Sequence, residues 1–444
     1  MNARRTLAVL SLASETVAAT LFWALALVGV ATLWASDAHA QSAGEYLARA
    51  GNCVVCHTAS DGKPFAGGLK MQTPLGASYT TNITPDPETG IGNYTLEDFD
   101  RAMRQGVTKQ GYTMYPAMPY PSYAKLRDDD IRSLYEFFMK EVAQVRKPNQ
   151  SSEIPWPLSM RWPLKLWAAL MVDEGVYRPK QQFDDEWNRG AYLVQGLGHC
   201  GACHTPRGWA FQEKALDEMQ SGYLTGANLD HWFASNLTGD ANAGLGRWTQ
   251  ADIVKLLKEG RNRHGAVFGT MTDVVNNSTQ YLTDPDLNGI AKYLKSLPPT
   301  MEWGEPAYTY DKRSAELLRT GQANRPGAAL YVRQCMACHG HDGQGYSPHI
   351  PSLAGNPVTM DRDPASLVNI VLNGSSRIVI GGVPDIYRMP PFRSNLNDQD
   401  IAGVLDFIRN SWGNRAAPVP SEAVASVREG TTPTGKRATI LRMR

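Results

Sequence analysis

Apolar residues recur at helical spacing in three places along the chain, each directly after an acidic or amide-containing turn. The last stretch has the i, i+3, i+4, i+7 pattern of one buried helix face, in Ile401, Val404, Leu405 and Ile408. Asp or Asn at such a position can cap a helix and favours its positive end. The pattern therefore predicts three closing helices, over residues 131–139, 287–297 and 401–409.

A shorter helical stretch stands well before each closing helix and carries a tyrosine, at Tyr46, Tyr192 or Tyr331. Loop-rich sequence separates the two stretches, in keeping with the 40 glycines and 28 prolines of the 444-residue chain. Two helices around a long irregular segment, repeated three times, predict a mainly α fold in three tandem units. The repeating unit is as long as a whole domain, which is much longer than the repeat of a solenoid protein.

The pattern Cys-x-x-Cys-His follows each tyrosine-bearing stretch. Its three copies use all six cysteines of the chain and one histidine each: Cys53, Cys56 and His57, then Cys200, Cys203 and His204, then Cys335, Cys338 and His339. This pattern is the attachment signature of c-type haem, because two thiols at this spacing can each add to one haem vinyl group. We therefore expect three covalent haem c groups, each with the adjacent histidine as a ligand of the iron.

Two other uses of paired cysteines fit less well. A structural zinc site needs four ligands, usually as two pairs, and motifs that begin at residues 53, 200 and 335 do not pair up. A thioredoxin-like redox pair belongs to a βαβ context, which the pattern does not indicate. Haem attachment remains the prediction.

The expected division of the chain follows from these repeats. It comprises a signal peptide at 1–40, a first unit at 41–145, a Trp/Pro-rich linker at 146–183, a second unit at 184–300, a polar linker at 301–320, a third unit at 321–415 and a tail at 416–444. The first two units share a further repeat, in which residues 81–86 resemble residues 235–240. Within it, Asn82 and Asn236 are expected to be turn residues beside the haem.

The N-terminus has the features of a secretory signal peptide. Arg4 and Arg5 precede an apolar run from Leu21 to Trp34, and Ala38-His39-Ala40 is a candidate cleavage site before Gln41. The run is short for a membrane span, and an uncleaved anchor is the alternative. Export agrees with the motifs, because covalent haem attachment in bacteria occurs outside the cytoplasmic membrane. We expect a peripheral protein at the periplasmic face of that membrane.

The second ligand of each iron is expected to be a methionine, because a thioether raises the reduction potential of an electron carrier. Distance from the closing helix selects Met118, Met271 and Met389 among 15 methionines. Met118 and Met389 precede proline, which stiffens a ligand loop. The alternatives, one for each unit in order, are Met114, His264 and Met360.

The remaining histidines are weaker candidates as ligands. His264 would give a bis-histidine haem, but it aligns with Gln110 and not with Met118. His199, His231, His341 and His349 are expected at the surface or beside the haem propionates. A carbonyl or carboxylate should orient each motif histidine, and Pro351 is the best candidate in the third unit, through its carbonyl.

Surface chemistry excludes one class of partner and indicates another. The net charge is +1 with no basic stripe, so nucleic acid is not expected. Two stretches mix apolar and basic residues in the manner of membrane-surface segments, namely 160–172 and 436–444. The first is expected to present Leu164, Trp167 and Met171 on one face. The alternatives are packing against a domain or partner subunit for the first stretch and a disordered end for the second.

Three such units in one exported chain resemble the cytochrome c subunit of membrane-bound, periplasm-facing dehydrogenases, which consists of class I cytochrome c domains. Besides the haem motifs, the likeness rests on residues 81–86, 115–120, 160–165, 186–196 and 203–208. The family includes the subunits of FAD-dependent gluconate 2-dehydrogenase, of sorbitol and glucose dehydrogenases, and of quinoprotein alcohol dehydrogenase.

The resemblance implies an electron-transfer subunit with no catalytic residues of its own. Its partners would be a separate FAD or PQQ dehydrogenase subunit, a small third subunit in some complexes, and ubiquinone, with gluconate the preferred substrate and alcohol or aldehyde the next. The sequence agrees, since it contains no dinucleotide-binding or phosphate-binding signature and no Ser/His/Asp arrangement. The alternatives are a multihaem peroxidase, which needs an iron with an open site, and a soluble electron shuttle.

Overall fold

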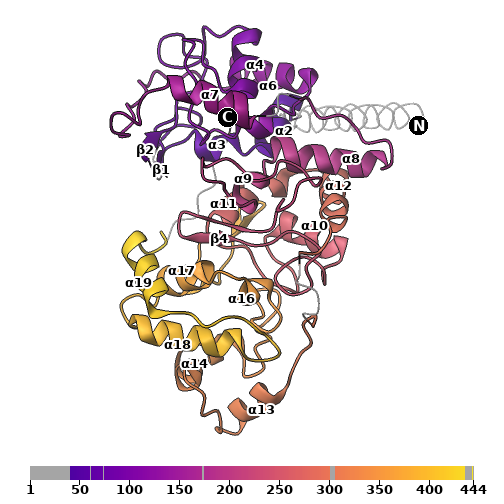
Figure 1. Cartoon of the computed structure of the whole chain (residues 1–444), viewed down its shortest axis with the longest axis vertical. Coiled ribbons are helices and arrows are strands. Elements are labelled where there is room, and N and C mark those ends of the chain that lie inside the picture. Colours follow the sequence, from indigo (N-terminus) through magenta and orange to yellow (C-terminus); the bar gives the residue numbers. More distant parts are fainter. Residues whose placement is uncertain are drawn as a thin grey trace, which may run out of the picture. The chain divides into compact units, whose positions relative to one another are not determined.

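The computed structural model describes residues 41–60, 62–73, 75–172, 175–300, 306–435 and 443. The predicted signal peptide and, apart from Met443, the basic end of the chain lie outside these residues. From Ala43 onward the chain forms one unit of structure. It is mainly helical, and its described strands form three two-stranded antiparallel hairpins (Figure 1). Within the described part of the chain, no helix combines the length and apolar character needed to cross a bilayer.

The first motif-bearing segment lies between two packed helices, α2 (Ala43–Ala50) and α6 (Asp128–Lys140). The predicted closing helix is thus confirmed, but it begins at Asp128, because the acidic residues form its first turn instead of preceding it. The elements in between are α3 (Cys53–Cys56), β1 (Lys70–Thr73), β2 (Gly76–Tyr79), α4 (Leu96–Gln105) and α5 (Tyr120–Tyr123).

The second segment repeats this plan between α8 (Asp185–Tyr192) and α12 (Asp284–Lys295), which confirms the second closing helix. Both α4 and α10 (Gln250–Glu259) begin with a capping box, made by Thr95 with Asp98 and by Thr249 with Asp252. The elements in between are η1 (Leu193–Leu197), α9 (Gly201–His204), β3 (Ala227–Leu229), β4 (Trp232–Ala234), α10 (Gln250–Glu259), α11 (Thr270–Asn277) and η2 (Thr279–Tyr281).

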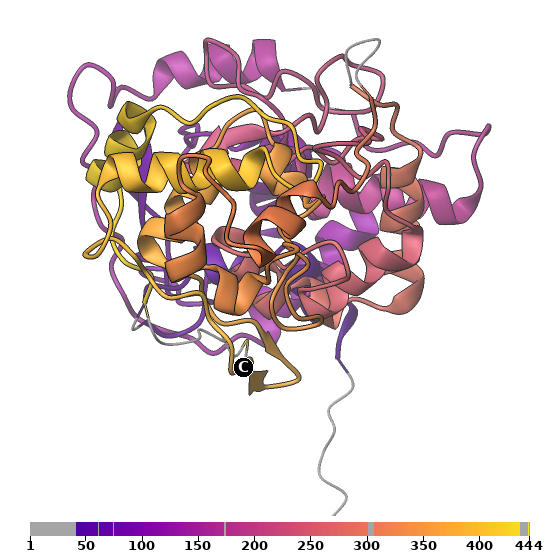
Figure 2. The same ribbon diagram turned by 90° about the horizontal axis from the view of Figure 1, so that it is seen from below.

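The third segment packs α14 (Ala328–Gln334) against the third closing helix, α18 (Asp398–Arg409). Figure 2, which is viewed from below, shows its orange and yellow helices in front. A short helix, α13 (Arg313–Arg319), occupies the end of the stretch expected as a polar linker. The other elements are α15 (Met336–His339), α16 (Pro357–Met360), α17 (Ala365–Asn373), β5 (Val379–Ile380), β6 (Val383–Pro384) and α19 (Ser421–Gly430).

Glycines allow the first and last helices of the units to approach closely. A Cβ atom added to Gly190 of α8 would lie 1.9 Å from the carbonyl oxygen of Gly289 in α12. One added to Gly327, at the start of α14, would lie 2.0 Å from the carbonyl oxygen of Gly403 in α18. Any side chain at these positions would separate the helices, so glycine is required by backbone contact.

Part of the expected tail belongs to the third unit. Helix α19 packs against α17 and α18 and buries Val424 and Val427 in the third unit's core. Arg428 of α19 also donates to Asp398 of α18 at 2.7 Å. Met443, expected in a membrane-facing end, is instead buried in the core shared by the first two units. The third unit therefore extends beyond residue 415, and Met443 does not face outward.

Helix α7 (Trp162–Met171) lies within the Trp/Pro-rich linker and is apolar on both sides. The face expected to point outward is turned towards the protein, because Trp167 donates its indole N–H to the Ala210 carbonyl at 2.8 Å and packs edge-on against Tyr120. The prediction for that face was wrong. The exposed side instead carries Trp162, Leu166 and Leu170.

Candidate functional site

Each Cys-x-x-Cys-His motif folds as a single helical turn. The backbone N–H of the motif histidine donates to the carbonyl of the first cysteine at 2.9–3.0 Å in all three copies. The six cysteines form no disulfide. Burial raises the pKa of Cys53, Cys200 and Cys335 to about 12. These thiols are therefore protonated at neutral pH, unlike the reactive thiolate of a dithiol redox pair.

A backbone carbonyl orients the ring of each motif histidine. His57 donates its Nδ1–H to the carbonyl of Thr81 at 2.8 Å. In the same way, His204 donates to the carbonyl of Ser235 at 2.7 Å, and His339 to that of Pro351 at 3.2 Å. Because Nδ1 is bonded in this way, Nε2 is the nitrogen left free to bind a metal.

The acceptor in the third unit was predicted, and the structure confirms Pro351 in that role. Thr81 and Ser235 were missed, although both directly precede the repeated asparagines Asn82 and Asn236, which was the available signal.

The three imidazoles are held in the neutral form. Burial lowers the pKa of His57, His204 and His339, while the hydrogen bond to the carbonyl opposes that change in each case. Neutral imidazole is the form that binds iron. The motif histidines are thus ready to act as ligands at neutral pH.

The repeated asparagines build the turns that carry these carbonyls. Asn82 accepts a hydrogen bond from the backbone N–H of Thr84 at 2.9 Å, and Asn236 accepts one from Thr238 at 2.8 Å. Both asparagines are buried. The prediction that they are turn residues is confirmed.

The second unit also contains a polar group that suits a bound acidic cofactor. The indole N–H of Trp248 is buried without a hydrogen-bond partner among the described residues. Such a donor normally has a partner, and a haem propionate would supply one. No cluster of three or more His, Cys, Asp or Glu that could hold a bare metal ion occurs in the described part of the chain. The unpartnered indole N–H of Trp248 thus fits a haem bound in this unit.

The candidate second ligands lie in different settings. Met118, Met271 and Met389 are each partly buried against one of three apolar clusters. Met271 stands in the first turn of α11, whereas Met118 and Met389 stand in loops before proline. The alternative Met360 is buried at the end of α16. The alternative Met114 is half-buried, and its backbone N–H donates to Gly106 at 2.7 Å.

The alternative His264 is engaged elsewhere. Its ring stacks on Trp248, with centroids 4.9 Å apart and planes at 10°. Its Nε2 lies 3.3 Å from the Asp252 carboxylate that caps α10. These contacts favour a structural role for His264.

The first and second motifs are neighbours in space. Nε2 of His199, which directly precedes Cys200, lies 3.3 Å from the carbonyl oxygen of Gly51, two residues before Cys53. The ring of Tyr123 packs edge-on against His199 with centroids 5.8 Å apart. His199 thus lies between the two motifs and is partly buried there.

Comparisons with known proteins agree with this site. The cytochrome c family model matches residues 41–141, and the model of cytochrome c oxidase, cbb3-type, subunit III matches residues 322–408. The gluconate 2-dehydrogenase cytochrome c subunit of Pantoea cypripedii is 50% identical over 88% of this chain and 89% of its own length.

Two further relatives have the same kind of name. The alcohol dehydrogenase (quinone) cytochrome c subunit of Gluconobacter oxydans is 48% identical over 89% of this chain and 84% of its own. The fructose dehydrogenase cytochrome subunit of Gluconobacter japonicus is 38% identical over 88% of this chain and 82% of its own. With its cytochrome c domains and attachment motifs, the chain belongs to the family of cytochrome c subunits of dehydrogenase complexes, electron carriers with haem c that serve a separate catalytic subunit.

Proposed function

We propose that this chain carries three covalent haem c groups and passes electrons from an FAD- or PQQ-dependent dehydrogenase subunit to ubiquinone. The observation that carries the haem number is the common construction of the three motifs, each a helical turn whose histidine donates Nδ1–H to a carbonyl. The middle unit shares this construction with the two units that the family models match. In each unit the two cysteines would hold the haem, and the iron would supply one-electron chemistry.

The residues proposed as iron ligands are the motif histidines His57, His204 and His339, and each would act together with one methionine, Met118, Met271 or Met389. For the second unit, the contacts of His264 with Trp248 and Asp252 support methionine over histidine. Filling both axial positions would leave no open iron, which speaks against the peroxidase alternative.

The proposed catalytic partner oxidises gluconate. The relative at 50% identity, a gluconate 2-dehydrogenase subunit, supports this choice, and the alcohol dehydrogenase relative at 48% makes alcohol the next candidate. A small third subunit completes the proposed complex. The substrate would contact the catalytic subunit, so this chain's role is limited to accepting and forwarding electrons.

The proposed location is the periplasmic face of the cytoplasmic membrane, with the outer face of α7 in the headgroup region. A helix that is apolar on all sides is normally covered on all sides. The outer face of α7 is uncovered in this chain: Trp162 is 71% and Leu170 69% exposed. Two further tryptophans stand exposed, Trp156 and, beside the Ala210 contact of α7, Trp209. Tryptophan favours the membrane interface, and the exposed Lys165 suits anionic headgroups.

Mass spectrometry tests the number of haems. The exported chain should retain three haem additions after acid–acetone extraction, because thioether bonds resist it. A variant with Cys200→Ser and Cys203→Ser should retain two. Two or fewer additions on the unaltered chain would contradict the proposal.

Reconstitution tests the electron-transfer role. Purified chain mixed with gluconate, sugars or alcohols should keep its haems oxidised, and adding the catalytic subunit should reduce them. Reduction by substrate in the absence of that subunit would exclude a purely electron-carrying role.

A further inference from the structure

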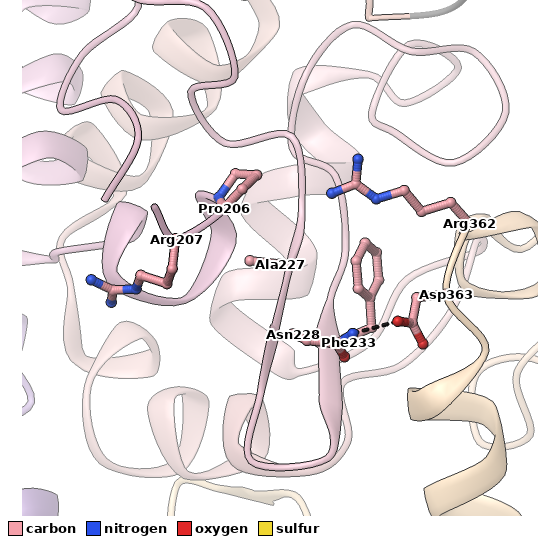
Figure 3. Close-up of a pocket in the computed structure, with 7 residues that line it drawn as sticks. All are labelled: Pro206, Arg207, Ala227, Asn228, Phe233, Arg362 and Asp363. Atoms are coloured by element: carbon pink, nitrogen blue, oxygen red, sulfur yellow. Dashed lines mark hydrogen bonds between the residues drawn. The ribbon is translucent and has the colours of Figure 1, made fainter. Parts of the chain in front are cut away.

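The third unit forms hydrogen bonds with the segment of the second unit that leads to Ser235, whose carbonyl accepts from His204. Ser366 of α17 bonds both backbone groups of Phe233 in β4, accepting its N–H at 2.9 Å and donating to its carbonyl at 2.8 Å. Arg362 donates to the carbonyl of Gly226 at 2.9 Å. Figure 3 shows Arg362 and Phe233 in the open pocket at this junction. The loop thus has a fixed position relative to the third unit.

One hydrogen-bonded chain runs through this junction to a motif histidine. The hydroxyl of Ser235 donates to a carboxylate oxygen of Asp361 at 2.8 Å. The carbonyl of the same Ser235 accepts from Nδ1–H of His204 at 2.7 Å. A carboxyl group of the third unit therefore holds the residue that orients the ligand histidine of the second.

The surroundings of Asp361 make this carboxyl unusual. It is 1% exposed, and its second oxygen has no hydrogen-bond partner among the described residues. Arg409 of α18 donates to its backbone carbonyl at 3.0 Å, and the charged groups that face the carboxyl are Arg409, Arg362 and Asp363. Burial raises the pKa of Asp361 to about 8, against the smaller opposing effects of Ser235 and Arg409. The carboxyl can therefore change charge near neutral pH.

The first unit braces its acceptor differently. There, the backbone N–H of Asn82, next to Thr81, donates to the neutral amide of Asn149 in the following linker at 2.7 Å. Ser235 bonds the Asp361 carboxylate through its own side chain. Within the described ranges, neither Thr81 nor Pro351 has such a bond from its side chain to a charged group. Among the residues that the structure describes, an acidic side chain thus bonds the acceptor residue only in the second unit.

We propose that Asp361 is a positioning residue for the second haem, which it influences from the third unit by holding Ser235 and by placing its own charge behind His204. This inference rests on the proposed haem at Cys200 and Cys203. A carboxylate in that position stabilises the oxidised, more positive iron, so ionised Asp361 lowers the reduction potential of this haem. The same charge is absent when the carboxyl is protonated.

Spectroelectrochemical titration of the holoprotein at about pH 6 and about pH 10 tests the proposal, since these values lie on either side of the Asp361 pKa. In the unaltered protein, one haem should become harder to reduce at the higher pH, by about tenfold in its oxidised-to-reduced ratio, or about 59 mV for one electron. Asp361→Asn should abolish this dependence, because the amide still accepts from Ser235 but has no charge.

Two further variants separate charge from position. Ser235→Ala should keep the pH dependence but change the low-spin signature of one haem, because the loop is no longer held. Asp363→Asn, in the same loop and without a bond to Ser235, should keep both the pH dependence and the low-spin signatures. Because the Asp363 charge raises the pKa of Asp361, its loss should only move the midpoint of the pH dependence to lower pH. The proposal is overturned if Asp361→Asn retains the pH dependence, or if Ser235→Ala leaves all three spectra unchanged. Mass spectrometry of each variant separates these outcomes from loss of the second haem, which would contradict the proposed function instead.

Discussion

Each motif histidine depends on a main-chain oxygen for its orientation, not on a side chain. Thr81 and Ser235 carry hydroxyl groups and Pro351 has no polar side chain, yet the backbone carbonyls of all three accept the same bond. A backbone acceptor persists when the side chain changes, so the ring orientation tolerates substitution provided that the loop keeps its path. This explains why three different residues fill one role.

The ligand opposite His204 is open to a paired test. Met271→Ala should remove the methionine-ligated low-spin signal of one haem among three and lower its reduction potential, because the thioether favours the reduced iron. His264→Ala is the matched control and should leave all three haem spectra unchanged, since its ring contacts Trp248 and Asp252. Optical and electron paramagnetic resonance spectra would show which residue binds. The reverse pattern would assign a bis-histidine haem to the second unit.

At the scale of elements, the first and last helices of a unit pack so closely that their backbones are in contact. Helices α8 and α12 meet where Gly190 faces Gly289, and a methyl group has no room there. The pair also encloses a charged contact, in which Arg189 donates twice to Asp286 at 2.8 Å. Close packing and this ion pair fix the frame within which the second motif lies.

Gly190→Ala should destabilise the protein by about 1–3 kcal/mol, because overpacking forces the helices apart. Thermal or denaturant unfolding would measure the change. Gly196→Ala is the control, since a Cβ there would lie 3.6 Å from the nearest side-chain atom, an ordinary contact. Equal stability of the two variants would show that the close contact between α8 and α12 at Gly190 does not require glycine.

For the whole molecule, the exposed face of α7 is the proposed route to the membrane. Changing Trp162, Leu166 and Leu170 together to serine should move the chain from the membrane to the soluble fraction, because the apolar contact is lost. Fractionation of cells that also produce the catalytic subunit would measure the shift. Ile386→Ser is the control, an apolar residue 75% exposed on the third unit. Unchanged membrane association of the triple variant would exclude this surface.

The sequence was sufficient for features that depend on local pattern. Spacing between residues close together in the sequence predicts the paired cysteines with their histidines, the closing helices and the Pro351 carbonyl. The outward face of α7 was missed, because Lys165 is the only charged residue of this helix and apolar residues occupy the rest of it. The bond from Ser235 to Asp361 joins residues 126 positions apart, and only the folded chain brings them together. The packing of α19 was also missed, since only Val424 and Val427 of its short, small-residue sequence mark the buried side.

The glycine crossings have a consequence for how the protein is made. In an exported chain, helix α8 cannot be covered at Gly190 until α12 has also crossed the membrane, yet Cys200 and Cys203 follow soon after α8. During that interval the thiols belong to an unclosed chain, which gives an attachment enzyme its easiest access to them. Once the helices meet, the haem would be enclosed by the same contact that completes the unit. In an exported chain, maturation and folding would thus follow the order in which the two halves of each crossing leave the membrane.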